Sequence, residues 1–577
     1  MKQIACLVFL GTLVIITAVG CSRKELDDET EYGALPLNGE GAEYGSLVVP
    51  RVAEIYENLA LLGKVWGFVK YTHNSFISGQ MYWDAELLGL IPLVLESGDV
   101  QSILYNWFVG LGDDGWVYLP PQGESLRLMS DMSWINYDRL GPLAEHLLRF
   151  NGVSNTDRSA APVFFGSLDI PDFSNQNSRP NMDFGNAGER LLGLFRLWNA
   201  MNYFFPHLDV LDSSWNDLLL RFIPKMLEGS DRRCFELTLA GLAHYLHDIN
   251  IHFFETRYLS TRFGGYIAPV QLIYAEGRIV VYDLPIIGVP FQRGDVILAV
   301  NGKDVDVLIS EMKPLSFFPN DDKALSLFSG RFVGFIQPGH PHLLVSHERT
   351  MYIDVLRGNF GMSYRVHGQS SSVFFSPQNV SHALLENNIG LINPWVQANV
   401  HVVMESLAST EGIIIDLRQR PHHEFGPAMG QYLMETPLPC RILSMPSQNF
   451  PGKRFNALLS NHFLQSPYAF IYDRPVVILM DEQSFGYTET VIMSLRTASN
   501  VTVIGTYTMG ATGVTARLPL PGRIMMSFTA LGAYTPEGGQ IHRVGLAPDI
   551  RVNRTIQGIA DGRDEIMEAA IQFIIEN

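Results

Sequence analysis

Three short apolar segments in the last third of the chain restrict its fold most, because each is hydrophobic without alternation. They are "GIIIDLR" (412–418), "PVVILM" (475–480) and "VTVIG" (501–505), with helices expected at 487–498 and near 562–575. Continuous apolar strands separated by helices predict a parallel sheet that is buried on both faces. Ligands of such sheets bind beyond the carboxyl ends of the strands. The turn at 481–486 lies at one of these ends and opens a helix whose backbone donors point at it.

Composition sets the size and class of the protein. The 577 residues are 47% hydrophobic, which is enough to bury several cores and indicates a multidomain chain. The formal net charge is -18 and no basic stripe is present, so nucleic acid is not an expected partner. Cys234 and Cys440 are expected to be free buried thiols, although pairing in an oxidising periplasm stays open.

The N-terminus, "MKQIACLVFLGTLVIITAVGC", has one early cation and a short apolar stretch, which predicts an export signal over residues 1–20. Its ending "AVGC" resembles a bacterial lipobox, which implies cleavage before Cys21 and acylation of the Cys21 thiol. Residues 21–45 are polar and acidic, as expected of a flexible linker. We therefore expect a lipid anchor in the bacterial cell envelope, at the outer membrane and on its periplasmic or surface face. A retained transmembrane helix is the alternative.

Residues 46–160 and 161–262 are expected to be two helical repeats, because a set of residues recurs at a constant offset of 132 positions. The first set is Trp66, Tyr71, Trp83, Ile91-Pro92 and Leu95-Glu96, and the second is Trp198, Tyr203, Trp215, Ile223-Pro224 and Leu227-Glu228. Apolar residues at three- and four-residue spacings predict a small helical bundle in each copy. Core packing, not a ligand cage, is the expected role of the tryptophans.

From about residue 263 the pattern changes to short strands and tight turns. "FQRGDVILAVNGKDV" predicts turn, strand, Asn-Gly turn and strand, and it resembles a PDZ domain over residues 263–360. Such domains take up a peptide C-terminus as an added strand. The nearest candidate for the carboxylate-binding loop contains Gly264, Gly265 and Tyr266. An ordinary β-hairpin is the alternative.

Taken together, the chain resembles a tail-specific, or C-terminal processing, serine peptidase, a family that includes the tricorn core. The resemblance rests on the order of the helical region, the PDZ-like module, "IIIDLR", the strand-turn-helix with Glu489, "VIGTYTMGATG" and "YTPEGGQIHRVGLAPDI". It implies a C-terminal α/β domain of the ClpP/crotonase type over residues 361–577. It also implies a protein that acts on, or binds, the C-termini of peptides or unfolded proteins, without a cofactor.

In that family a serine attacks the peptide, a lysine removes its proton, and the serine stands three residues before a glutamate. By this resemblance the nucleophile position falls on Gly486 and the base position on Ala511, while a following glutamine falls on Thr515. Hydroxyl attack on an amide needs an oxygen within hydrogen-bond reach of a base, and neither residue supplies one. The fold can still form, because Gly486 and Glu489 stand in the register of a capping box, where glycine replaces serine at small cost.

A rebuilt site stays open at this point. Ser484 is the first candidate for a substitute nucleophile and Thr488 the second, with hydrogen bonding within the turn as the alternative role of Ser484. "RPHHEF" supplies His422 and His423 as candidate bases, where the family has glycine-rich oxyanion residues.

Other polar motifs are expected to be structural. Asp416 and Arg418 end a buried strand and predict an ion pair or a turn bond. His244 and His247 lie one helical turn apart, which is too few converging ligands for zinc, so no metal is expected. Three functions remain: a peptidase by descent, a non-catalytic peptide-binding protein, and a carrier of an apolar ligand, since the α/β fold also occurs in retinoid-binding proteins.

Overall fold

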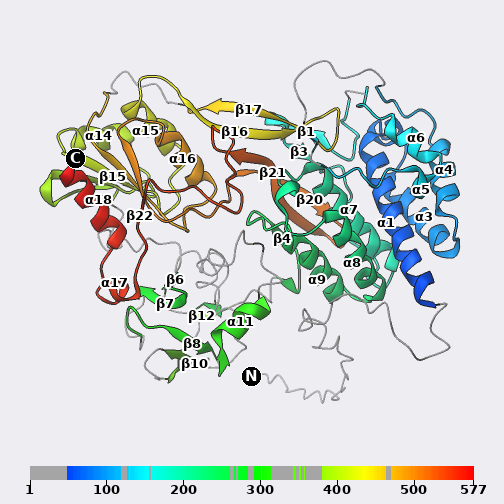
Figure 1. Ribbon diagram of the computed structural model, residues 1–577, viewed down its shortest axis with the longest axis horizontal. Helices are drawn as coiled ribbons and strands as arrows, with labels where there is room; N and C mark the ends of the chain where they lie inside the picture. Colours follow the sequence, from blue (N-terminus) through cyan, green and yellow to red (C-terminus); the bar gives the residue numbers. More distant parts are fainter. Residues whose placement is uncertain are drawn as a thin grey trace, which may run out of the picture. The chain divides into compact units, whose positions relative to one another are not determined.

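A six-stranded sheet forms where the apolar runs predict it (Figure 1). Its order is β13-β14-β15-β18-β19-β22, and all neighbours are parallel except β13 and β14. The strands are β13 (His382–Leu385), β14 (Ile389–Ile392), β15 (Gly412–Asp416), β18 (Val476–Met480), β19 (Val501–Gly505) and β22 (Ile550–Arg551). Every residue of β14, β15 and β18 is buried. This confirms the prediction of a mainly parallel sheet.

Helices cover both faces of this sheet. One face packs against α14 (Val400–Leu407), α15 (Phe425–Leu433) and α16 (Tyr487–Leu495), and the other against α18 (Glu565–Glu576). Successive strand residues alternate between the two cores: Ile413 and Ile415 belong to the first, and Ile414 to the second. The lack of polar alternation in the sequence therefore reflects burial on both sides.

The computed structural model describes one part of the chain in detail, and all of it lies in the unit Val48–Asn577. The described residues are 48–117, 127–128, 130–154, 157–259, 266–267, 271–283, 291–300, 302–312, 317, 342–345, 350–352, 356–357, 380–462 and 470–577. Cys21, Gly264 and Gly265 lie outside them. Among the described helices, none combines the length and the hydrophobicity that crossing a membrane requires.

A second, antiparallel sheet has the order β1-β17-β16-β21-β20, and β4 also pairs with β21. Its strands are β1 (Arg127–Leu128), β4 (His252–Phe254), β16 (Pro439–Pro446), β17 (Lys453–Ser460), β20 (Gly513–Leu520) and β21 (Ile524–Tyr534). The sequence patterns did not predict this sheet. Strands β1 and β4 come from the segments that were expected to be purely helical, because two or three residues are too few for a period-2 signal.

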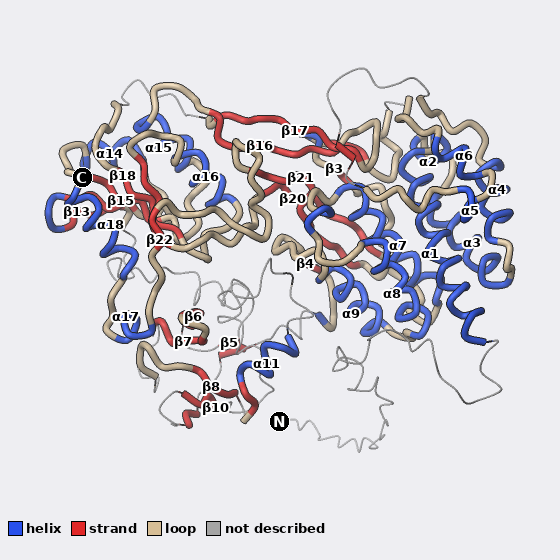
Figure 2. Tube along the Cα trace, in the orientation of Figure 1, coloured by secondary structure: helices blue, strands red, loops and turns tan. Residues whose placement is uncertain are grey.

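The helical segments gather side by side (Figure 2). They contain α1 (Val48–Thr72), α2 (Asn74–Ile77), α3 (Trp83–Glu96), α4 (Val100–Gly110), α5 (Tyr137–Leu140), α6 (Leu143–Leu148), α7 (Ala187–Phe204), α8 (Trp215–Glu228), α9 (Arg232–His244), the 3-10 turns Ser167–Asp169 and Leu208–Val210, and the short strands β2 (Phe164–Phe165) and β3 (Pro171–Asp172). Their core is continuous with residues of β16, β20 and β21.

Equivalent hydrogen bonds occur in the two helical segments. The Trp66 indole nitrogen donates to the carbonyl of Trp83, and the Trp198 indole nitrogen donates to the carbonyl of Trp215, both at a distance of 2.8 Å. The tryptophans therefore have the packing role that the sequence predicts.

Helices α1 and α7 contact each other through positions that share the 132-residue offset. A Cβ atom on Gly63 would lie 2.7 Å from the Phe195 ring, and one on Gly67 would lie 1.9 Å from the Asn199 side chain. The rings of Tyr71 and Tyr203 are 5.5 Å apart. Glycine at 67 is therefore required for the close approach of the two helices.

The middle of the chain contributes short strands and a helix. They are β5 (Tyr266–Ile267), β6 (Gln271–Ala275), β7 (Arg278–Asp283), β8 (Ile297–Val300), β9 (Lys303–Asp304), α11 (Val305–Met312), β10 (His342–Val345), β11 (Thr350–Tyr352) and β12 (Leu356–Arg357). Helix α17 (Ile556–Ala560), from near the C-terminus, packs against β6 and β7. Val300 pairs with Lys303, and Gly302 has φ 77°. The predicted strand pairing on either side of the Asn-Gly sequence is thus present, while Asn301 itself lies outside the described residues.

The two thiols differ in burial. Cys440 is buried and Cys234 is only partly buried, and neither forms a disulfide. The expectation that the two thiols do not form a disulfide is confirmed, whereas the expectation that both are buried is wrong for Cys234.

Two histidines stack face to face in the core beside β21. The rings of His207 and His542 are 4.2 Å apart and parallel within 1°. Burial, followed by the neighbouring His542 and Arg454, holds the pKa of His207 well below its usual value, and burial lowers the pKa of His542 to about 3 despite a backbone hydrogen bond, with Arg543 and His247 also lowering it. Both imidazoles are therefore neutral at pH 7.

This pair predicts acid sensitivity. The unfolded chain binds protons on these histidines below a pKa of about 6.5, whereas the folded chain does not. Stability is therefore complete above about pH 6.5 and falls as the pH drops toward 3. Lowering the pH from 7 to 5 should reduce the free energy of unfolding by about 2 kcal/mol per buried histidine, measured by urea unfolding.

The matched comparison uses His542→Gln, which should reduce the pH dependence, and His462→Gln, which replaces an exposed histidine and should leave it unchanged. Equal pH dependence in all three chains would contradict this account of the pair.

Candidate functional site

The turn between β18 and α16 places Gly486 at the N-cap of the helix. Its backbone angles are φ 62° and ψ -114°, a region that residues with a side chain rarely adopt. A Cβ atom built on Gly486 would meet no other atom within 4 Å. The position where the family resemblance expects a nucleophile therefore faces open space and carries no side chain.

Glu489 ties this turn to the loop that follows β19. It is fully buried, and its Oε2 accepts hydrogen bonds from the backbone nitrogens of Gly486 at 3.0 Å and Ala511 at 2.9 Å. Its Oε1 accepts from the Thr508 hydroxyl at 2.6 Å and from the Gly510 nitrogen at 2.7 Å. Burial raises the pKa of Glu489, and these four hydrogen bonds oppose that shift. The contact between Glu489 and Gly486 is the half of the predicted capping box that glycine allows.

The structure thus brings the two positions of the expected catalytic pair to one carboxylate oxygen. Ala511 is buried, and its carbonyl accepts a hydrogen bond from the Asn250 side chain at 3.0 Å. Neither Gly486 nor Ala511 offers a hydroxyl or an amine. Thr515 lies further along, in strand β20.

Ser484 is fully buried in the turn. Its hydroxyl donates to the carbonyl of Leu417 at 2.7 Å and accepts from the Asp481 nitrogen at 3.1 Å. Both bonds join the serine to backbone groups, not to an imidazole or amine. This is the turn-stabilising alternative that the sequence left open, and Thr488 is likewise buried, on the first turn of α16.

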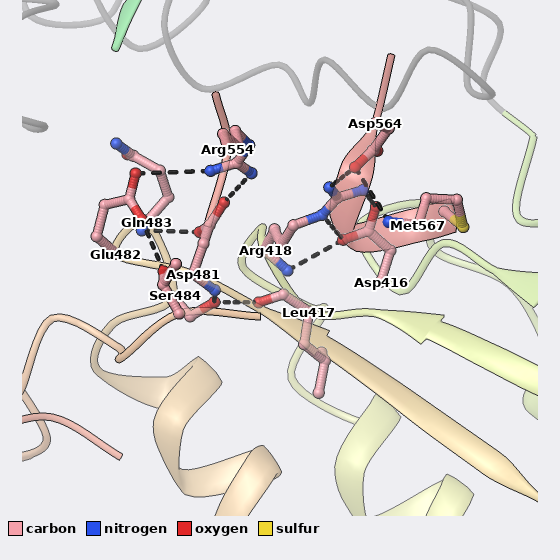
Figure 3. A network of polar contacts seen from close by, with 11 residues as sticks. Asp416, Leu417, Arg418, Asp481, Glu482, Gln483, Ser484, Arg554, Asp564 and Met567 are labelled. Carbon is pink, nitrogen blue, oxygen red and sulfur yellow. Dashed lines mark hydrogen bonds and ion pairs between the residues drawn. The ribbon is translucent and has the colours of Figure 1, made fainter. Parts of the chain in front are cut away.

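Two arginines anchor the strand ends around this turn, as Figure 3 shows. Arg418 lies between Asp416 at 2.7 Å and Asp564 at 2.8 Å, and Arg554 binds Asp481 at 2.6 Å. Burial alone would lower the pKa of Arg418, but the two carboxylates raise it well above its usual value. The ion pair between Asp416 and Arg418 is thus structural, as predicted.

A cleft of about 370 Å³ opens beyond the carboxyl ends of β14 and β15. It is lined by Trp395, Gln397, Arg420, Pro421, His422, His423 and Glu424. The backbone nitrogen of His422 donates to the carbonyl of Pro394 at 2.9 Å, and the Tyr487 hydroxyl donates to the backbone carbonyl of His423. The candidate bases therefore line a cleft, and the backbone of one of them, His423, contacts the first residue of α16. Burial lowers the pKa of His422.

In the motif "HYLHDINIH" the residues that contact the candidate site are Asp248 and Asn250, which were not predicted to have a role. Asp248 accepts hydrogen bonds from the nitrogen and hydroxyl of Thr529 at 2.7 and 2.9 Å, and Asn250 reaches Ala511 and Thr529. His247 instead pairs with Asp212 at 3.2 Å. Within the described residues no group of three potential metal ligands occurs. The sequence feature that could have indicated these contacts is the pair of a carboxylate at Asp248 and an amide at Asn250.

Comparison with known proteins agrees with this geometry. Residues 392–552 match the model of peptidase family S41. This part of the chain is therefore a peptidase family S41 domain. A curated relative, the carboxy-terminal-processing protease of Bartonella bacilliformis, is 29% identical over 92 residues, which are 16% of this chain and 21% of that protein. The matched segment thus spans about a fifth of that relative's length.

Solved structures share the fold over a larger part of the chain. The structure of mature CPAF complexed with lactacystin has a TM-score of 0.51 and 15% identity, covering 68% of this chain and 99% of that chain. Mature CPAF alone gives a TM-score of 0.50 and 14% identity, covering 68% and 98%. At these identities the likeness concerns the fold.

Removing the acceptor at Glu489 should weaken the site. In Glu489→Gln one oxygen becomes an amide that faces two N–H or O–H donors, so two hydrogen bonds are lost. Relief of a buried charge offsets part of this, and we expect a loss of about 2 kcal/mol in the free energy of unfolding, measured in urea. Glu537→Gln, at an exposed position, should change stability by less than about 0.5 kcal/mol. Equal stability of the two variants would contradict the role given to Glu489.

The backbone at Gly486 makes a second prediction. Gly486→Ser and Gly486→Ala should each cost about 1–3 kcal/mol through backbone strain, and both should fold because the added atoms meet open space. Since the strain lies in the backbone, the two variants should agree in urea unfolding. A serine variant as stable as the wild type would show that the turn adopts another conformation.

Proposed function

We propose that this chain binds the C-termini of peptides or unfolded proteins and does not hydrolyse them. The observation that carries the proposal is the shared acceptor Glu489 Oε2, which holds the backbone of Gly486 and Ala511 in place while neither residue has a reactive side chain. In serine proteases stripped of their catalytic side chains, only about 10³–10⁴-fold catalysis over water remains. A scaffold that is kept without its chemistry is suited to binding.

The cleft supplies a binding surface next to this turn. Trp395 is 37% exposed there and offers an aromatic face, and Arg420, His422 and His423 offer donors to a peptide carbonyl or carboxylate. Its place at the carboxyl ends of parallel strands is where ligands of such sheets bind. These features support a peptide ligand over an apolar carrier function, for which a deep apolar cavity would be needed.

The middle of the chain supports a second contact with the peptide. The β6–β7 and β8–β9 hairpins agree with the PDZ-like module expected over residues 263–360, and Tyr266 pairs with Arg357 in a two-stranded ladder. We propose that this module receives the peptide C-terminus as an added strand.

The setting of the protein is also part of the proposal. Acylation of Cys21 would tether the chain to the bacterial cell envelope, which places it where unfolded secreted proteins occur. The two helical segments are proposed to be an internal duplication, because the 132-residue offset relates both the indole hydrogen bonds and the contacts between α1 and α7.

Binding and turnover can be measured in one experiment. The purified chain is titrated into a fluorescently labelled, unstructured peptide that has an apolar residue and a free carboxylate at its C-terminus. Binding is followed by fluorescence anisotropy, and the mass of the recovered peptide is then measured by mass spectrometry. We expect saturable binding, weaker binding of the amidated peptide, and intact peptide. Trp395→Ala should weaken binding about tenfold or more, whereas Tyr137→Ala, an exposed aromatic on α5, should not.

Two outcomes would overturn the proposal. Cleavage of the peptide that is lost in Ser484→Ala would establish a rebuilt peptidase site. Saturable binding of a lipid without any binding of peptide would establish the apolar carrier.

A further inference from the structure

Arg158 is a buried arginine outside the site described above. The residue is 6% exposed, and within the described part of the chain none of its three guanidinium nitrogens, Nε, Nη1 and Nη2, has a hydrogen-bond partner. Burying a cation without a partner is among the most costly arrangements in a protein interior. An unpartnered guanidinium on a buried side chain therefore points to a group that completes it.

Other buried arginines of this chain show how the fold normally satisfies such a group. Arg196 binds Asp84 at 2.6 Å and the carbonyls of Asn177 and Pro519. Arg454 donates to Ser444 and to the carbonyls of Phe204 and Ala530. In contrast, no donor of the Arg158 guanidinium has such an acceptor among the described residues.

The backbone around Arg158 is held in place, so the side chain is presented by an ordered loop. The Ala161 nitrogen donates to the carbonyl of Arg158 at 2.9 Å. The Asn175 side chain donates to the carbonyls of Ser159 and Ala161, both at 2.8 Å. Gln176 donates to the carbonyl of Pro162 at 3.0 Å and accepts from Lys70 at 2.8 Å. The segment that carries the guanidinium is therefore fixed by hydrogen bonds to its backbone.

The charge persists at neutral pH. Burial lowers the pKa of Arg158 to about 10, so the group is protonated at pH 7. The adjacent Asp157 accepts a hydrogen bond from the Ser159 nitrogen at 3.0 Å, and burial is the cause of the lowered pKa of Arg158. A negative charge must come from elsewhere.

We propose that Arg158 is the anchor of a carboxylate-binding site in the segment between α6 and α7. The guanidinium fork matches the two oxygens of a carboxylate and can donate to both. The Phe165 ring lies 5.8 Å from its Cζ, which gives the site an apolar flank. This favours a carboxylate that carries an apolar group, either a small organic acid or the C-terminus of a peptide. The site does not depend on the function proposed for the cleft.

The test is thermal unfolding of the full chain, purified in detergent at pH 7, in sodium acetate or in sodium chloride of equal ionic strength. Acetate should raise the unfolding temperature of the wild type by about 1–2 °C and the effect should saturate. Arg158→Met should lose this response and should be at least as stable as the wild type in chloride, because an unpaired charge is gone. Arg149→Met, at an exposed arginine on the end of α6, should respond as the wild type does.

A short peptide ending in phenylalanine, with a free or an amidated C-terminus, separates the two sources of the carboxylate. A shift at lower concentration for the free peptide than for acetate, which is lost in Arg158→Met, identifies a peptide terminus at this site, and a response to acetate alone that depends on Arg158 identifies a small acid. The same acetate response in the wild type and in Arg158→Met would overturn the site, as would a lack of response in the wild type.

Discussion

The buried carboxylate of Glu489 is the contact on which the arrangement of the candidate site depends. It joins the turn before α16 to the loop at 508–511, and it does so through backbone nitrogens of Gly486, Gly510 and Ala511. Because these donors belong to the backbone, the hydrogen bonds themselves need no reactive side chain at 486 or 511. A polar network in a buried site is strong when every member is satisfied, and here four donors serve two oxygens. The shape of the site is therefore independent of catalytic chemistry.

The helical segments and this loop form one packed structure. Asn250, which follows α9, reaches the carbonyl of Ala511 and the hydroxyl of Thr529. The largest hydrophobic core runs from the tryptophans of α1 and α7 to residues of β16, β20 and β21. The stacked rings of His207 and His542 join the segment after α7 to the segment after β21. Changes in the helices are thus expected to reach the loop that carries Ala511.

Local patterns predicted the parallel sheet, the cap at Gly486 and Glu489, the Asn-Gly hairpin and the ion pair of Asp416 with Arg418, since each depends on neighbours in sequence or on burial of a single strand. The pairs β16–β17 and β20–β21 are hairpins between neighbouring strands. The antiparallel sheet as a whole was missed, because the pairings of β16 with β21, β1 with β17 and β4 with β21 join segments far apart in the sequence, and strands β1 and β4 are very short. The partners of Glu489 beyond the cap, and the roles of Asp248 and Asn250, are likewise long-range contacts. The sequence around Arg158 does not show that its guanidinium lacks a hydrogen-bond acceptor among the described residues, because this depends on which distant residues the fold brings near it.

The central claim is that the turn 481–486 retains its position without a nucleophile. The most direct measurement is the intact mass of the purified chain after prolonged incubation with a fluorophosphonate, which phosphonylates activated serines with loss of fluoride, followed by peptide mapping. The account predicts an unchanged mass, since Ser484 is engaged with backbone groups and residue 486 has no hydroxyl. A stoichiometric adduct on a residue between 481 and 490 would contradict it.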